Sequence, residues 1–166
     1  NLNTKRALVD EDGVISWVNG NMGSGVTMLY PMSVLRGARS KSDFLGVAFA
    51  GPRQEQDTGH KVVLVAPNTS ANVRSKSIAL GGGVSTYRGL VKATPAAVDS
   101  SVSVVCDTLM MDGESRAITI PIIDDSAPDM TVEHEASVGR LNDAQIAYLS
   151  TRGLDGDAAR RAVING

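Results

Sequence analysis

The sequence is poor in two residue types that stabilise many small folds. It has one cysteine, Cys106, and aromatic residues make up only 4% of its 166 residues. A single cysteine excludes an internal disulfide framework and is typical of a reducing compartment. Because compact cores of this size usually contain more large rings, the few aromatic residues and the 17 glycines favour short strands stacked in a regular way.

No charge of one sign and no long apolar run dominates the chain. Its 16 basic and 18 acidic residues give a net charge of -2, which argues against nucleic acid as a partner. No run reaches the roughly 18 apolar residues that indicate a membrane span, and no apolar signal-peptide region follows the first residues. We therefore expect a cytoplasmic protein without a membrane partner, or a protein of the organelle stroma if its source is eukaryotic.

The sequence has no initiator methionine, and strand-like residues begin by about Ala7. It also stops abruptly after Asn165 and Gly166. These features predict a fragment of a longer protein, although 166 residues suffice for one domain with its own core.

The first two thirds of the chain consist of short runs rich in β-branched residues, each bounded by Gly, Pro, Asn, Asp or Ser. Strands are predicted over residues 7–9, 14–18, 26–30, 32–35, 44–49, 61–65, 72–78, 86–92, 102–111 and 117–123. Their spacing of roughly 8 to 12 residues favours an all-β fold. Hairpin signals are scarce and the connectors are too short for crossover helices, which a parallel β-helix accommodates. A β-sandwich stays open, because no strict repeat period is visible.

The end of the chain has a helical pattern instead. Asn142 can cap a first helix, Gly153 can end it in a left-handed conformation, and Asp155 can cap a second helix. The chain therefore divides into a β-helix core, residues 1–140, and the start of a C-terminal helical domain, residues 141–166.

Cys106 is the first candidate for chemistry. Strand alternation places Cys106 and Thr108 on one face and Val105 and Asp107 on the other. A cysteine among valines is commonly an inert core residue. A thiolate that accepts sulfur or binds a metal would need partial exposure and a lowered pKa. The pattern leaves both roles open.

The segment Glu133-His134-Glu135 is the densest group of metal-ligand types in the chain. If it is extended, Glu133 and Glu135 share one face, about 7 Å apart, and His134 takes the other. Such a carboxylate pair could bind a cation, and the imidazole could bind iron or zinc. A solvated charged edge is the alternative. The two-histidine helix of zinc proteases is excluded, because position 138 is valine.

The remaining motifs are weaker indications of function. Gly81-Gly82-Gly83 lacks the Gly-Lys-Ser/Thr continuation of a nucleotide-binding loop, so a turn is expected there. His60 lies in a polar stretch, for which a surface role is expected. No Ser-His-Asp order or G-x-S-x-G elbow supports a serine hydrolase.

Taken jointly, ten of these segments resemble the SufB/SufD family of the SUF iron–sulfur cluster assembly system. They follow the family's order over essentially the whole chain, at residues 17–24, 30–31, 48–51, 56–59, 66–70, 75–78, 87–91, 106–109, 133–136 and 148–154. The resemblance implies an all-β fold, a right-handed parallel β-helix followed by a short C-terminal α-helical segment. It also implies an assembly scaffold with no enzymatic activity of its own, which builds a transient iron–sulfur cluster from iron and delivered sulfur.

The resemblance implies the partners as well. These are a SufD paralogue, the SufC ATPase docked by the helical segment, a cysteine desulfurase or sulfur carrier, and the apo iron–sulfur proteins that receive the cluster. The exposed ends of a β-helix would also favour pairing with another chain.

By family match, Cys106 is the sulfur acceptor or cluster ligand, and Glu135 is a ligand or handles protons. Glu133 and His134 belong to the same cluster-binding group, and Cys106, Glu135 and His134 are the candidate iron ligands. This combination favours the SufB side of the family. A SufD-like structural subunit without a cluster site is the alternative, and a carbohydrate-active β-helix is a more distant one. Val65 or a neighbour stands where many relatives carry histidine, so no role of that histidine is expected here.

Overall fold

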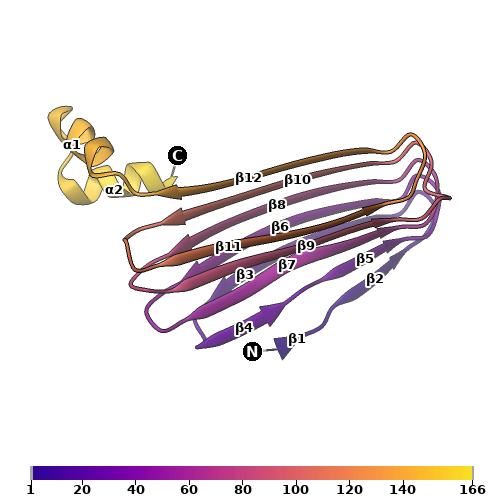
Figure 1. Cartoon of the computed structure of the whole chain (residues 1–166), viewed down its shortest axis with the longest axis horizontal. Coiled ribbons are helices and arrows are strands. Elements are labelled where there is room, and N and C mark those ends of the chain that lie inside the picture. The colour runs from indigo at the N-terminus through magenta and orange to yellow at the C-terminus, as the bar shows by residue number, and fades with distance from the viewer. Residues whose placement is uncertain (1, 166) are drawn as a thin grey trace.

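The computed structural model describes residues 2–165 and forms a parallel β-helix of about five turns, followed by two short helices (Figure 1). Two parallel sheets face each other across a narrow interior. Within the described part of the chain, sheet A comprises β1 (Leu2–Asn3), β2 (Arg6–Val9), β4 (Val26–Leu29), β5 (Met32–Leu35), β7 (Glu55–Leu64), β9 (Val84–Ala93) and β11 (Arg116–Asp125). Sheet B comprises β3 (Val14–Met22), β6 (Lys41–Ala50), β8 (Ser70–Ala79), β10 (Ser101–Met110) and β12 (Thr131–Arg140).

Each strand pairs in parallel with the equivalent strand one turn further along the chain. In sheet B, one column contains Val14, Lys41, Ser70, Ser101 and Thr131, so turns in this sheet take between 27 and 31 residues. This varying turn length hides the repeat from a search for a strict period. The expected β-helix is therefore confirmed, and the β-sandwich is excluded.

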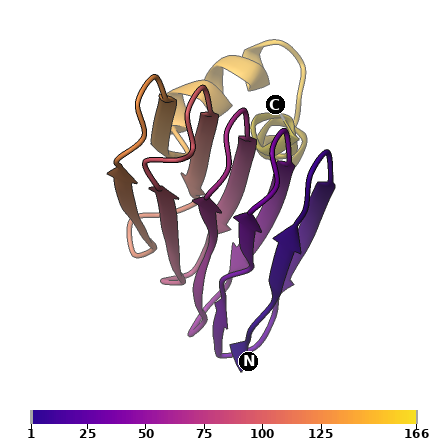
Figure 2. The ribbon, with the colours of Figure 1, turned by 90° about the vertical axis from the view of Figure 1, so that its right-hand side faces the viewer.

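One corner of the β-helix repeats from turn to turn. Residues with positive φ values between 55° and 60° occur there once per turn, at Asp12, Arg39, Asn68, Asp99 and Asp129. Asn and Asp tolerate this left-handed conformation better than most side chains. The backbone N–H of Asn68 donates to a carbonyl of the next turn, and so do the equivalent groups of Asp12 and Arg39. Figure 2 looks along the strands and shows the successive turns side by side.

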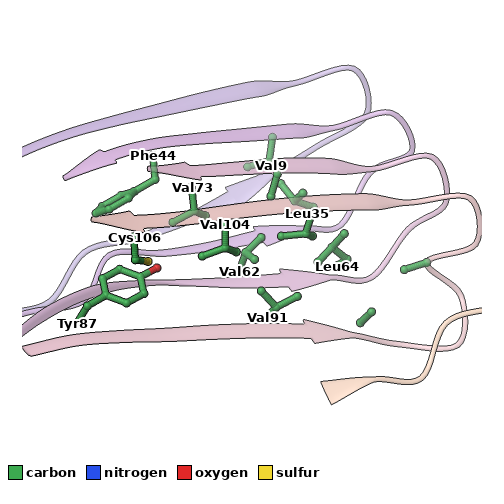
Figure 3. Close-up of a cluster of buried hydrophobic side chains, with 14 residues drawn as sticks. Val9, Leu35, Phe44, Val62, Leu64, Val73, Tyr87, Val91, Val104 and Cys106 are labelled. Atoms are coloured by element: carbon green, nitrogen blue, oxygen red, sulfur yellow. The ribbon is translucent and has the colours of Figure 1, made fainter. Parts of the chain in front are cut away.

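The polarity of the buried side chains changes along the direction of the strands. Apolar side chains such as Leu35, Leu64 and Val91 fill one half (Figure 3). The half nearer the helices is rich in buried polar side chains, namely Asn19, Asn21, Thr27, Gln56, Thr58, Ser75, Ser77, Ser85 and Thr108. Strand prediction from alternation assumes that polar side chains face the solvent. The buried polar residues break this assumption, which is one reason why the polar start of β7 was not predicted as a strand.

Both C-terminal helices begin where the sequence indicated, and the first also ends there. Helix α1 covers Asp143–Thr151, and the Asn142 side chain accepts a hydrogen bond from the backbone N–H of Ala144. Gly153 follows with a φ of 92°. Helix α2 covers Gly156–Asn165, and Asp155 accepts from the N–H of Ala158. Neither helix is long and apolar enough to cross a membrane, within residues 2–165.

All ten predicted strands are present, several of them longer than predicted. Strand β7 begins at Glu55 rather than at residue 61, and the short strand β1 was not predicted. Strand β12 was also missing from the prediction, since its charged sequence lacks the apolar alternation of the other strands. Among the described residues β12 is an edge strand with no partner strand on its far side, so charged residues are tolerated there.

Candidate functional site

Cys106 lies on the inner face of β10 and is only 2% exposed. In register, it stands between Ser75 on β8 and Ala136 on β12. The alternation predicted around it is correct, because Thr108 is buried on the same face. Across the interior, the hydroxyl of Tyr87 on β9 points toward the Cys106 sulfur (Figure 3).

The surroundings of Cys106 disfavour its thiolate at rest. Burial raises the pKa of the Cys106 thiol to about 11, and the nearby charge of Asp107 acts in the same direction. A hydrogen bond from Tyr87 lowers that pKa, but burial is the larger effect. Burial likewise raises the pKa of Tyr87. Because the thiolate is the nucleophile and metal ligand, Cys106 is a protonated, unreactive thiol at neutral pH in this conformation.

A glycine two residues along β9 leaves room for the Tyr87 ring. A Cβ atom added at Gly89 would be 3.0 Å from the Tyr87 Cε1 atom and 3.2 Å from its hydroxyl oxygen. The ring therefore lies over the bare backbone of Gly89. Phe44 has the same arrangement on β6, where a Cβ at Gly46 would be 2.7 Å from the Phe44 ring.

The segment Glu133-His134-Glu135 is extended, as considered from the sequence. Its residues pair in register with Ser103, Val104 and Val105 of β10. Because Val104 faces the core, His134 faces the interior, while Glu133 and Glu135 lie on the outer face of sheet B. All three are exposed, because β12 is the last strand of sheet B in the described chain.

The structure thus brings together only some of the predicted site residues. Cys106 and His134 share the inner face on neighbouring strands, whereas both glutamates are on the opposite face. Within residues 2–165, no group of three or more His, Cys, Asp or Glu side chains is arranged to hold a metal ion. Stable iron–sulfur clusters generally have about four protein ligands, so this chain alone does not supply a complete set in this conformation.

A small pocket opens at the end of the β-helix beside this inner face. It is lined by Tyr87, Gly89, Val91, Val104, Pro121, Ile122, Ile123 and His134. Ile122 and Ile123 are about half exposed, since β11 is also an end strand. We call this the end-turn pocket. Cys106 is not among its lining residues, but Tyr87, whose hydroxyl points toward the Cys106 sulfur, is one of them.

The side chain of His60 lies inside the β-helix and not on its surface. The surface role expected for it is wrong, because its side chain is 1% exposed and stacks on Phe44. The His60 Nε2 atom lies 3.4 Å from the Ser33 hydroxyl oxygen. Burial lowers the pKa of His60 to about 4, so it is neutral at physiological pH. The available signal was its phase with Thr58 and Val62, which alternation also places inside.

Three of the short sequence segments meet on adjacent strands of sheet A. The hydroxyl of Tyr30 and the guanidinium of Arg88 both bond to the Asp57 carboxylate on the outer face. Gly59 is required beside them, because a Cβ there would lie 1.8 Å from the backbone oxygen of Arg88. These segments therefore hold β7 and β9 close together where Thr58 pairs in register with Tyr87.

Comparison with known proteins agrees with this geometry. The family profile described as "SUF system FeS cluster assembly, SufBD core domain" matches residues 1–166. An iron-sulfur cluster assembly SufBD family protein of Mycobacterium tuberculosis (strain ATCC 25618 / H37Rv) is 46% identical over 166 residues, which are 100% of this chain and 20% of that protein. One of Staphylococcus aureus (strain USA300) is 42% identical over the same length, 36% of that protein. The chain thus spans about a fifth to about a third of these relatives, and it belongs to the SufBD family of iron–sulfur cluster assembly proteins.

Proposed function

We propose that this chain is the sulfur-accepting part of a SufB-type scaffold, on which a nascent iron–sulfur cluster is assembled. The position of Cys106 carries this proposal. The only cysteine of the chain lies one strand from the end of the described β-helix, directly beside the strand that bears His134 and Glu135. A SufD-type subunit would need the fold but no thiol at this place.

The chemistry requires only that Cys106 becomes a thiolate and meets a donor. The Cys106 thiolate attacks the terminal sulfur of a donor persulfide, so that a new S–S bond forms as the donor's S–S bond breaks. The transferred sulfur keeps its hydrogen, and the donor leaves as a thiolate that takes up the proton Cys106 lost. No net oxidation occurs, because one S–S bond replaces another. A cysteine desulfurase or its sulfur carrier is the donor.

Iron is the second substrate. His134 faces the same side of the sheet as Cys106, which suits an imidazole ligand for iron. Glu135 lies on the outer face beside it, where it handles protons or binds iron at the strand edge. A partner chain supplies the remaining ligands at the open end. Incomplete ligation suits a scaffold, since the cluster must leave for an apo iron–sulfur protein.

The partners follow from the two exposed parts of the chain. A SufD paralogue pairs at the end of the β-helix, where β11 and β12 present unpaired backbone edges among the described residues. The SufC ATPase binds the helical segment, where Tyr148 is 58% exposed. ATP hydrolysis belongs to SufC, and the chain itself has a cytoplasmic scaffold role.

Anaerobic cluster reconstitution tests this function. The full-length protein is assembled with SufC and SufD, and bound iron, sulfide and the visible spectrum are compared for wild type, Cys106→Ser and Glu135→Ala. Glu114→Ala, on an exposed turn, is the matched control. We expect loss of the cluster with Cys106→Ser and a reduced yield with Glu135→Ala, while size-exclusion chromatography shows intact complexes. Equal cluster content in all four proteins contradicts a site at Cys106.

The burial of Cys106 favours a second candidate, a SufD-like structural subunit. A thiol that is 2% exposed with a raised pKa is what a filler of the core would show. In that case Cys106→Ser leaves cluster assembly unchanged. The two candidates differ in this one result, so the same reconstitution separates them.

A further inference from the structure

We propose that Tyr87 is a positioning residue that closes the route between the end-turn pocket and Cys106, so that a sulfur donor reaches the thiol only after the Tyr87 ring has moved. This inference rests on the proposed role of Cys106 as sulfur acceptor. It assigns to Tyr87 a role in controlling access, in addition to its part in the core.

The Tyr87 side chain has contacts on two sides. On one side its hydroxyl points toward the Cys106 sulfur (Figure 3) and forms a hydrogen bond with it. On the other side Tyr87 lines the end-turn pocket together with Pro121 and His134. The pocket lies at the end of the described β-helix, while Cys106 itself is only 2% exposed.

The neighbours of Cys106 on sheet B are small. Ala136 stands beside it toward the end of the β-helix, and Ser75 stands beside it on the other side. A methyl group and a hydroxymethyl group cover a thiol poorly. The large group that faces Cys106 is therefore the Tyr87 ring from the opposite sheet.

The backbone beneath the ring leaves it room. Gly89 has no Cβ, and an added one would be 3.0 Å from the ring and 3.2 Å from the hydroxyl oxygen. The closed position of Tyr87 is thus compatible with glycine and crowded by any larger residue. The interaction of its hydroxyl with Cys106 and its contacts within the buried core keep the ring in this position.

Closing the route and bonding to the thiol have opposite effects on Cys106 reactivity. The hydrogen bond from Tyr87 lowers the pKa of the thiol, so its loss alone would leave less thiolate and slow the reaction with an electrophile. If the Tyr87 ring leaves the position in which it blocks access to Cys106, that reaction becomes faster instead. The direction of the change in Tyr87→Phe therefore distinguishes the two roles.

The test measures modification of Cys106 in the full-length protein at neutral pH, without iron, sulfur donor or partners. The probe is methyl methanethiosulfonate, and mass spectrometry follows the peptide that contains Cys106. We expect Tyr87→Phe to react about three- to tenfold faster than wild type, the factor that corresponds to one neutral hydrogen bond. Tyr87→Ala should react faster still. Tyr30→Phe, which removes a tyrosine hydroxyl from the outer face, should react at the wild-type rate.

Gly89→Ala provides a second variant that keeps the tyrosine. Its methyl group crowds the closed ring, so we expect faster modification of Cys106 here too. Circular dichroism and the melting temperature establish that each compared variant is folded. A rate for folded Tyr87→Phe and Gly89→Ala that equals or falls below the wild-type rate overturns the proposal. Because no cluster is formed in this assay, its result is independent of the reconstitution with Cys106→Ser.

Discussion

The imidazole of His60 on β7 stacks on the phenyl ring of Phe44 on β6, with ring centroids 4.7 Å apart and an angle of 20° between the planes. The two rings come from opposite sheets and join them across the interior. The His60 Nδ1 atom has no hydrogen-bond partner among the described residues. A neutral imidazole tolerates this setting, whereas a charged one does not.

The first prediction concerns pH. Burial lowers the pKa of His60 to about 4, below its ordinary value of 6.5, so the unfolded chain binds the proton more readily. The contribution of His60 to stability is therefore complete above about pH 6.5 and is lost as the pH falls toward 4. The loss amounts to about 3 kcal/mol. Urea unfolding at a series of pH values measures it.

His60→Phe is the matched variant for this measurement, because it keeps the ring stack and cannot take up a proton. Between about pH 6.5 and 4, its free energy of unfolding should fall less steeply than that of wild type. Parallel curves for the two proteins would mean that other groups cause the acid sensitivity, with His60 exposed or already protonated in the fold.

The second prediction concerns the close approach of β7 and β9 at Gly59. Gly59→Ala places a methyl group 1.8 Å from the backbone oxygen of Arg88, so β7 and β9 must separate. We expect a loss of about 3 kcal/mol, at the upper end of overpacking effects. Chemical denaturation of the purified variant gives the value.

Gly113→Ala is the control for this change, since an added Cβ there meets no atom within 4 Å. It should leave stability unchanged or raise it by about 0.5 kcal/mol through the unfolded chain. Similar free energies of unfolding for Gly59→Ala and Gly113→Ala would show that β7 and β9 accommodate the added methyl group at Gly59.

The third prediction compares two ion pairs. Arg88 donates to both carboxylate oxygens of Asp57, whose side chain is only 17% exposed. Asp57→Asn weakens these charge-assisted bonds, and we expect it to lower the free energy of unfolding by about 1–2 kcal/mol. Thermal and urea unfolding at low and high salt provide the measurement.

Asp10→Asn tests the same chemistry at the surface. The Asp10 side chain is 71% exposed and pairs with Arg36, so solvent screens the pair. Its free energy of unfolding should equal that of wild type within error. If Asp57→Asn also leaves the free energy of unfolding unchanged, the pair between Asp57 and Arg88 does not stabilise the fold.

Much of the local structure could be predicted from neighbouring residues. The caps of both helices at Asn142 and Asp155 depend on side chains within three residues of the bonds they make. The facing of Cys106 followed from strand alternation. By contrast, the burial of His60 was hidden, because the residues around it are polar and a buried polar stretch looks like a surface loop. Strand β12 was hidden by its charges, which an end strand tolerates.

The sequence by itself determined ten of the strands, the alternating faces around Cys106, the helix caps and the family, since each depends on short segments and their order. Only the tertiary structure decided which side chains meet across the interior. Tyr87 reaches Cys106, and Phe44 reaches His60, from strands of opposite sheets. These contacts depend on how turns of 26 to 32 residues stack in register. Burial of the inward-facing side chains and the geometry of the corners set that register, and both involve residues a whole turn apart, so no short segment specifies it alone.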